Sequence, residues 1–163
     1  MNMTHYMQLL ADNQPWNLLL FMAIPVVLAE TVAVTELFIL LRRPGGGSLV
    51  ALNRAAGIAA GAYFIGVFAY LMATAVVPLT SAGQWRGPAD VIAVGFYLAG
   101  VGPLGAIALI DLRWIGARWS TETRLAAHAL AVAAFLVVAH VAMIFGMLDP
   151  SVLGAAGPDH TMH

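Results

Sequence analysis

The sequence has no cysteine, no lysine and few charged residues of any kind. Without cysteine, disulfides, thiolate metal sites and cysteine-held iron–sulfur clusters are excluded. Charged residues make up 9% of the 163 residues, whereas about 25% is usual in soluble domains. The net charge of −1 offers no basic field for nucleic acid. Because 61% of the residues are apolar, a soluble enzyme and a disordered chain are also excluded. The composition predicts an integral membrane protein.

Four apolar stretches are long enough to cross a bilayer, which takes about 20 mostly apolar residues in a helix. Breaker residues such as Pro44 and the glycines after it separate them. The sequence therefore predicts an all-α fold, an integral membrane four-helix bundle in one domain with two outer tails. The expected spans are 16–41, 51–77, 89–112 and 123–148, and the expected tails are 1–15 and 149–163.

The arginines predict the orientation of the bundle. Six of the seven flank the first or the third loop, and only Arg86 lies in the second. Loops that carry the positive charge stay in the cytoplasm. We therefore expect a multi-pass protein of the bacterial inner membrane, with both termini and the Arg86 loop in the periplasm.

Small residues and prolines predict how the spans pack. Gly57 and Gly61 lie four residues apart, a spacing that allows two helix backbones to approach closely. Pro25 should bend the first span, and Gly102-Pro103 should bend or break the third. A broken membrane helix can bind ions through its freed carbonyls, or the bend can serve packing alone.

Methionine and histidine gather on the predicted outer side. His140, Met143 and Met147 share one face of the fourth span, and Met22 and Met72 lie in the outer halves of the first two. The tails add Met3, His5, Met7, His160, Met162 and His163. Thioether with imidazole is a soft ligand set that selects copper(I). The pattern predicts a copper site open to the periplasm, for transport, sequestration or delivery; the alternative is that the methionines fill gaps between helices.

Ionisable residues inside the first span predict a second polar feature. A carboxylate at the depth of Glu30 or Glu36 is costly, so it usually faces the bundle interior and marks a site. Matching depths pairs Glu36 with His128 and Glu30 with Tyr63. This ladder would suit a proton or cation path, and its alternative is a pair of helix–helix hydrogen bonds. Asp111, near the end of the third span, is expected to be structural.

Haem is the competing cofactor. His128 and His140 are twelve residues apart on one span, a pattern similar to cytochrome b, but the first three spans contain no histidine. Ligation by two histidines from different helices of one chain is therefore excluded. A b-type haem between His140 and Met22 or Met72 stays open; the protein would then be an oxidoreductase acting with a quinone, whereas otherwise no enzymatic activity is expected. A structural subunit of a larger membrane complex is the third interpretation.

The first forty residues resemble a group of known sequences. Thr4-His5-Tyr6-Met7 and the segment Ile24-Pro25-Val26-Val27-Leu28-Ala29-Glu30 are similar to small bacterial four-helix membrane proteins that often carry the label permease. The resemblance implies the four-helix fold and no activity. The expected partners are the lipid bilayer, a periplasmic metal-binding protein or a quinone, and a second copy of the chain in a homo-oligomer.

Overall fold

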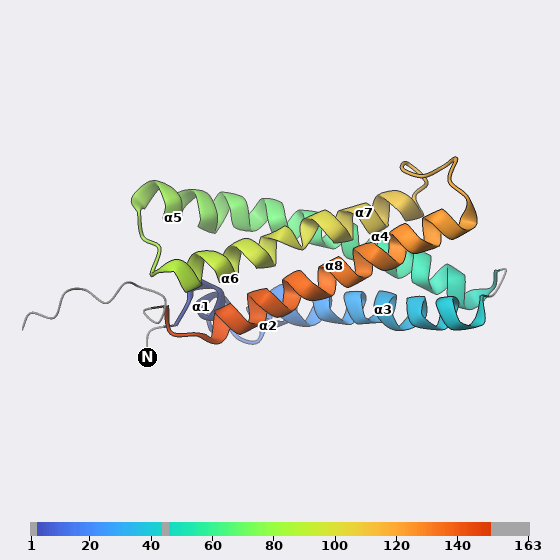
Figure 1. Ribbon diagram of the computed structural model, residues 1–163. Coiled ribbons are helices and arrows are strands. Elements are labelled where there is room, and N and C mark those ends of the chain that lie inside the picture. Colours follow the sequence, from blue (N-terminus) through green and yellow to red (C-terminus); the bar gives the residue numbers. More distant parts are fainter. Residues whose placement is uncertain (1–2, 44–45, 151–163) are drawn as a thin grey trace, which may run out of the picture.

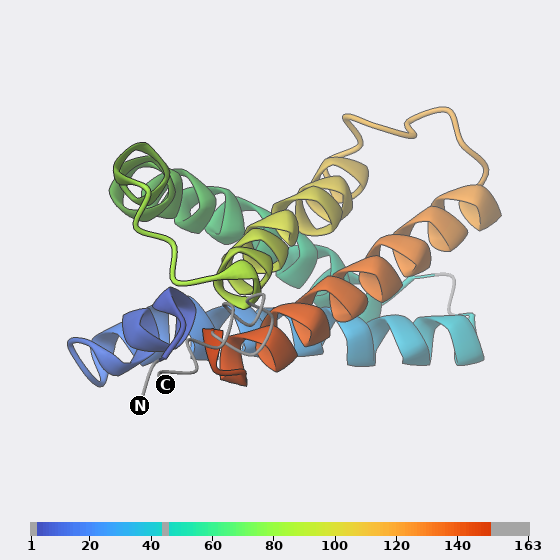
Figure 2. The same ribbon diagram turned by 60° about the vertical axis from the view of Figure 1, so that its left-hand side comes forward.

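The computed structural model describes residues 3–43 and 46–150, and every regular element in these ranges is a helix. Four long helical stretches run alongside one another (Figures 1 and 2), and each is long and apolar enough to cross a membrane. They are Trp16–Arg42, Ser48–Ala82, Pro88–Asp111 and Thr121–Met147. The prediction of an all-helical fold with four such helices is confirmed.

Ten labelled elements make up these stretches and the segment before them. They are α1 (His5–Ala11), α2 (Trp16–Leu18), the π-helical η1 (Leu19–Ala23), α3 (Ile24–Arg42), α4 (Ser48–Leu71), the π-helical η2 (Met72–Val76), α5 (Val77–Ala82), α6 (Pro88–Ala99), α7 (Val101–Asp111) and α8 (Thr121–Met147). α4 packs along α3 and α7, and α6 packs along α8, whereas α3 and α8 touch each other much less. Cavities remain beside α3 and α8 toward both ends of the bundle.

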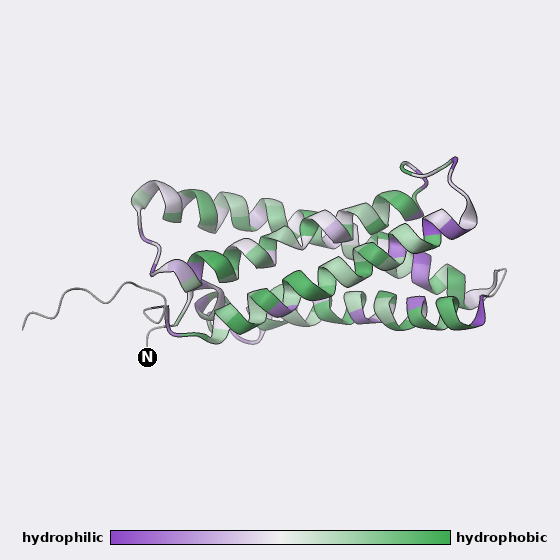
Figure 3. Cartoon of the chain, viewed as in Figure 1, coloured by the Kyte–Doolittle hydropathy of each residue, from purple (hydrophilic) through white to green (hydrophobic). Residues whose placement is uncertain are grey.

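Hydrophobic residues predominate along all four helical stretches (Figure 3), with a few hydrophilic residues between their ends. The central cluster of the bundle brings together side chains from α3, α4, α7 and α8, which are Val32, Phe64, Leu104, Ile107 and Val132 among others. Many large apolar side chains point outward instead, among them Val27, Leu37 and Leu130. An apolar exterior of this kind is what contact with lipid tails requires.

Pro25 changes the helix that leads into α3. A proline has no N–H, so it leaves carbonyls in the preceding turn without their helical partner, and that turn is the π-helical η1. The two freed carbonyls accept tyrosine hydroxyls: Tyr97 donates to Phe21 at 2.7 Å and Tyr63 donates to Leu20 at 2.9 Å. The carbonyls that the broken helix exposes are therefore occupied by side chains from α6 and α4.

Prolines also explain two boundaries that differ from the predicted ones. The second stretch continues past Pro78 to Ala82, because the π-helical η2 widens the turn just before that proline. The third stretch divides at Gly100, between α6 and α7. This break was predicted near Gly102-Pro103; it falls earlier because Pro103 cannot donate to the carbonyl of Ala99, four residues before it.

The N-terminal segment, predicted as a tail, forms the helix α1 and packs against α6 and α8. Thr4 begins it: its hydroxyl accepts from the backbone N–H of Met7 at 3.3 Å and donates to the carbonyl of Gly146 at 2.8 Å. The ring of Tyr6 contacts that of Tyr97, with centroids 5.1 Å apart. This segment therefore closes one end of the bundle.

Candidate functional site

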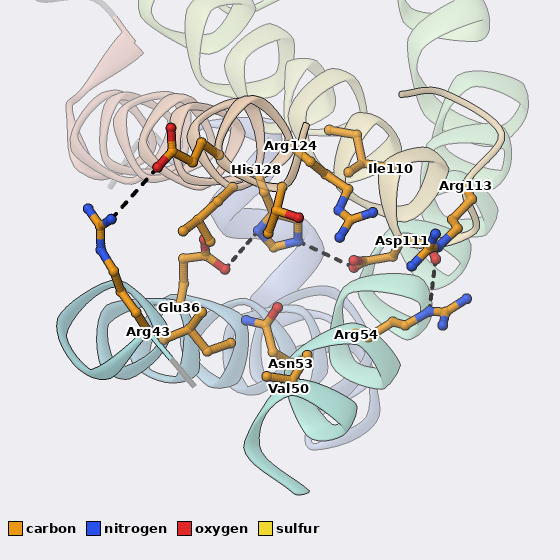
Figure 4. Close-up of a pocket in the computed structure, with 14 residues that line it drawn as sticks. Glu36, Arg43, Val50, Asn53, Arg54, Ile110, Asp111, Arg113, Arg124 and His128 are labelled. Carbon is orange, nitrogen blue, oxygen red and sulfur yellow. Dashed lines mark hydrogen bonds and ion pairs between the residues drawn. The ribbon is translucent and has the colours of Figure 1, made fainter. Parts of the chain in front are cut away.

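A histidine between two carboxylates lies near the arginine-rich end of the bundle (Figure 4). His128 of α8 has its Nδ1 2.9 Å from Oε2 of Glu36 on α3, and its Nε2 3.3 Å from Oδ2 of Asp111 at the end of α7. The side chains are 6%, 4% and 12% exposed for the histidine, the glutamate and the aspartate. We call this group the His128 triad. The expected pairing of Glu36 with His128 is present, and Asp111 is the member that sequence reasoning missed.

One oxygen of the triad has no partner. Oε1 of Glu36 is buried without a hydrogen bond from any described residue. The contact of Glu36 Oε2 with His128 has the distance of an ion pair but not the direction of a hydrogen bond, so Nδ1 is also without a hydrogen bond. A buried acceptor without a donor is unfavourable, which marks this side of Glu36 as a place where a ligand or a water molecule would bind.

Close packing of α4 against α7 positions Asp111. A Cβ at Gly57 would overlap with Oδ2 of Asp111, so only glycine leaves room for this carboxylate. From the same helix, Nε of Arg54 donates to the Asp111 carbonyl at 2.8 Å. Nearby, Asn53 donates to Oγ1 of Thr35 at 2.8 Å and so ties α4 to α3. In the sequence, Gly57 was therefore the feature that could have identified Asp111 as a partner of His128. The depth of Asp111 in the third span did not indicate this.

The triad forms part of the lining of a cavity of about 400 Å³, which we call the arginine cavity. Four arginines from separate segments line it, together with the three triad residues: Arg43, Arg54, Arg113 and Arg124. Figure 4 shows their side chains arranged around the triad, and Arg43 lies at 4.0 Å from Glu122 with both groups largely exposed. The end of the bundle at which the sequence analysis placed most of the arginines therefore contains a cavity.

A second cavity, of about 410 Å³, lies toward the other end, and we call it the methionine cavity. Its walls come from α1, the segment around η1, α3, α4, α6 and α8, and they are mostly apolar. Its sulfur, imidazole and carboxylate residues are Met3, Met7, Met22, Met143, Met147, His140 and Glu30. Six of the residues predicted as metal ligands therefore line one cavity.

The orientation of His140 is fixed by a backbone contact. Its Nδ1 lies 2.6 Å from the carbonyl of Leu136, one turn earlier in α8. When Nδ1 donates this hydrogen bond, Nε2 keeps its lone pair, the arrangement found in histidines that bind metals. Tyr6 also lines this cavity, and burial raises the pKa of its hydroxyl to about 12. It stays neutral at physiological pH and offers no tyrosinate ligand.

Other predicted ligands lie elsewhere. Met72 packs in η2 against an apolar cluster and does not line the methionine cavity. Nδ1 of His5 contacts Oδ2 of the fully buried Asp90 at 2.5 Å, and its backbone N–H donates to Oδ1 at 2.6 Å. His5 therefore links α1 to α6. His160, Met162 and His163 lie outside the described residues.

The expected contact between Glu30 and Tyr63 is absent. The Tyr63 hydroxyl donates to Leu20 instead, because the carbonyl freed by Pro25 lies within its reach. Glu30 is exposed on α3 and makes no hydrogen bond or ion pair with any residue in ranges 3–43 and 46–150. The expectation of a ladder from Glu30 through Tyr63 to Glu36 was wrong on this contact.

Acidic and histidine side chains alone do not form a metal site in the described part of the chain, where no group of three or more has that arrangement. In the His128 triad this follows from geometry: each ring nitrogen already faces a carboxylate, so the three groups do not point at a common centre. A site built on thioethers is of a different kind, and five methionines are among the residues that line the methionine cavity.

Comparison with known proteins gives a family and no activity. No curated protein and no solved structure matches the chain. The profile of one family covers nearly all of the sequence, residues 1–162. The chain therefore belongs to DUF6803, a family of unknown function.

Proposed function

We propose that this protein binds a soft transition-metal ion, copper(I) in first place, in the methionine cavity. One observation carries the proposal: five methionines and His140, from three separate parts of the chain, line a single cavity. Thioethers combined with imidazole favour copper(I) over harder divalent ions. Because thioethers resist the oxidation that converts thiols to disulfides, such a site suits an oxidising compartment.

Two charge and bonding features support a cation there. The backbone contact of His140 leaves Nε2 free to bind. Glu30 adds a carboxylate to a largely apolar wall, and a carboxylate in a membrane-spanning helix is costly without a partner. A single bound monovalent cation would neutralise it, so the cavity is better suited to copper(I) than to a neutral ligand.

The biological setting follows from the arginines. Six of the seven arginines flank the first and third connections, so the positive-inside rule predicts that both termini lie in the periplasm and that the methionine cavity lies toward the periplasmic side of a bacterial inner membrane. The terminal residues His160, Met162 and His163 would then collect the ion or pass it to a periplasmic metal-binding protein. Transport across the membrane would use the His128 triad as the proton-binding stage, and four helices per chain favour a homo-oligomer for that role.

Anaerobic copper(I) loading of the purified full-length protein tests this proposal. We expect one copper ion per chain in the methionine cavity. His140→Ala and Met143→Leu should each lower the affinity for copper(I) at least about tenfold. Substitutions of residues that merely support a metal ligand already cause losses of this size. Met72→Leu is the matched control, since this methionine lies outside the cavity and leucine keeps its volume.

An absorption spectrum and elemental analysis of the same sample separate the alternatives. Equal binding by the wild-type protein and both cavity variants would reject the methionine cavity as the site. A Soret band would assign a b-type haem and a quinone-linked oxidoreductase instead. Stable co-purification with another membrane subunit, without copper or haem, would reject metal binding in favour of a structural subunit.

A further inference from the structure

The arginine cavity contains positive charge that the protein itself does not neutralise. Arg43 has Glu122 at 4.0 Å, but no described carboxylate lies within ion-pair distance of Arg54, Arg113 or Arg124. The buried Glu36 and the partly buried Asp111 are each opposed by a nitrogen of His128. Three guanidinium groups around one cavity are therefore available to a ligand.

These three arginines come from three segments of the chain, whereas the charges of an ordinary loop lie on one segment. The three groups come from α4, from the connection after α7 and from the start of α8, and the fold brings them around one cavity (Figure 4). Arg118 belongs to the same connection as Arg113 but does not line it. A guanidinium matches the oxygens of a phosphate through paired hydrogen bonds, and basic pockets between membrane helices bind lipid head groups.

A second observation points to the same cavity from its buried side. Glu36 is 4% exposed, lines the cavity, and has an Oε1 without a hydrogen-bond donor among the described residues. This oxygen calls for a hydroxyl or an ammonium group. A ligand that carries a phosphate and such a donor would satisfy the arginines and Glu36 together.

We infer that the arginine cavity binds a phosphate group that belongs to a phospholipid head group or to a soluble phosphate compound, with a neighbouring hydroxyl or ammonium donor directed at Glu36. The phosphate lies against Arg54, Arg113 and Arg124. The donor group lies deeper, beside the His128 triad. The site is separate from the methionine cavity, and the binding of copper there does not depend on it.

Binding to the delipidated full-length protein in detergent tests the inference. Native mass spectrometry would measure the affinities of phosphatidylglycerol, phosphatidylethanolamine and phosphatidylcholine, and thermal unfolding would measure protection by inorganic phosphate. We expect the first two lipids, which carry a hydroxyl or an ammonium donor, to bind more tightly than phosphatidylcholine, which has none. Arg113→Gln and Arg124→Gln should each weaken binding about fivefold, and together roughly 25-fold. Protection by inorganic phosphate alone would assign a soluble phosphate, and binding of the lipids alone would assign a head group.

Arg118→Gln is the matched control and should leave the affinity unchanged. As a test that does not depend on any variant folding, binding to the wild-type protein should weaken at high salt because the charges are screened. The inference is overturned if Arg118→Gln weakens binding as much as Arg113→Gln, or if the three lipids bind equally. It is also overturned if neither phosphate nor lipid binds, or if a divalent cation alone protects the protein.

Discussion

At the level of single residues, His128 is the buried side chain that contacts two carboxylates. It lies between two carboxylates inside the bundle, at 2.9 Å from Glu36 and 3.3 Å from Asp111. Burying two carboxylates is costly unless a positive or donating group opposes them. The histidine supplies that group to both acids, so its removal should leave both of them buried without compensation.

We predict that His128→Gln lowers the free energy of unfolding by about 3–5 kcal/mol, the usual effect of removing one partner of a buried ion pair. Denaturant unfolding in detergent measures this. His140→Gln is the control, because His140 is exposed and should change stability little. Glu36→Gln combined with His128→Gln should cost less than the sum of the two single changes, since the double variant leaves one carboxylate fewer. Simple additivity would show that the two side chains do not interact.

Pro25 is the second residue with an effect beyond its own position. It leaves two carbonyls without helical partners, and tyrosines from two other helices donate to them. The polar hydroxyls of Tyr63 and Tyr97 therefore have a structural role near the methionine cavity. This accounts for the failure of depth matching between Glu30 and Tyr63: the matching considered side chains only, and the backbone supplied the better acceptor.

At the scale of the elements, the contact between α4 and α7 depends on two glycines four residues apart. A Cβ at Gly61 would lie 2.5 Å from the Cβ of Ala108 and 2.6 Å from the carbonyl oxygen of Leu104. Backbone atoms cannot move aside without shifting α7. Gly66, on the same helix, has open space around it.

We predict that Gly61→Ala destabilises the protein by about 1–3 kcal/mol through overpacking. Gly66→Ala should be neutral or stabilising by up to about 1 kcal/mol, because alanine is the better helix former. Thermal unfolding of the two variants in the same detergent compares them directly. Similar stabilities would mean that α4 and α7 do not pack as closely as these contacts require.

At the scale of the whole molecule, the bundle is chemically polarised. Helix α1 lies at one end of the bundle and the connection between α7 and α8 at the other (Figure 1). The methionine cavity is lined partly by α1, and the arginine cavity and the His128 triad lie toward the α7–α8 connection. Because four helical stretches can cross a membrane, both termini should lie on the same side of it.

Reporter fusions test this topology in the intact cell. A C-terminal fusion to a reporter that is active only in the periplasm should be active, and a fusion in the 112–120 connection should be inactive. The positive-inside rule gives both expectations. Activity in the opposite pattern would reverse the orientation and put the methionine cavity on the cytoplasmic side, where a copper site would have a different role.

Much of the site chemistry could be inferred from spacing along one helix. His140, Met143 and Met147 were predicted to share a face, and all three line the methionine cavity. Met3 and Met7 were predicted as ligands in an outer tail, and they line the same cavity because α1 docks against α6 and α8. Met72 was assigned to the same site from its depth in the second span, but its side chain packs against an apolar cluster and does not line the cavity.

Composition and the positions of single residues were enough to predict a lipid environment, four spanning helices and an uneven distribution of charge. Apolar runs, breaker residues and the placement of arginine are properties of a linear chain, and each has a direct physical reading. Which polar groups contact one another depends on how the helices pack. Asp111 reaches His128 because Gly57 has no side chain, and two tyrosines turn to carbonyls that Pro25 frees. Such contacts depend on the separation and rotation of packed helices, which the local sequence of any one helix does not specify.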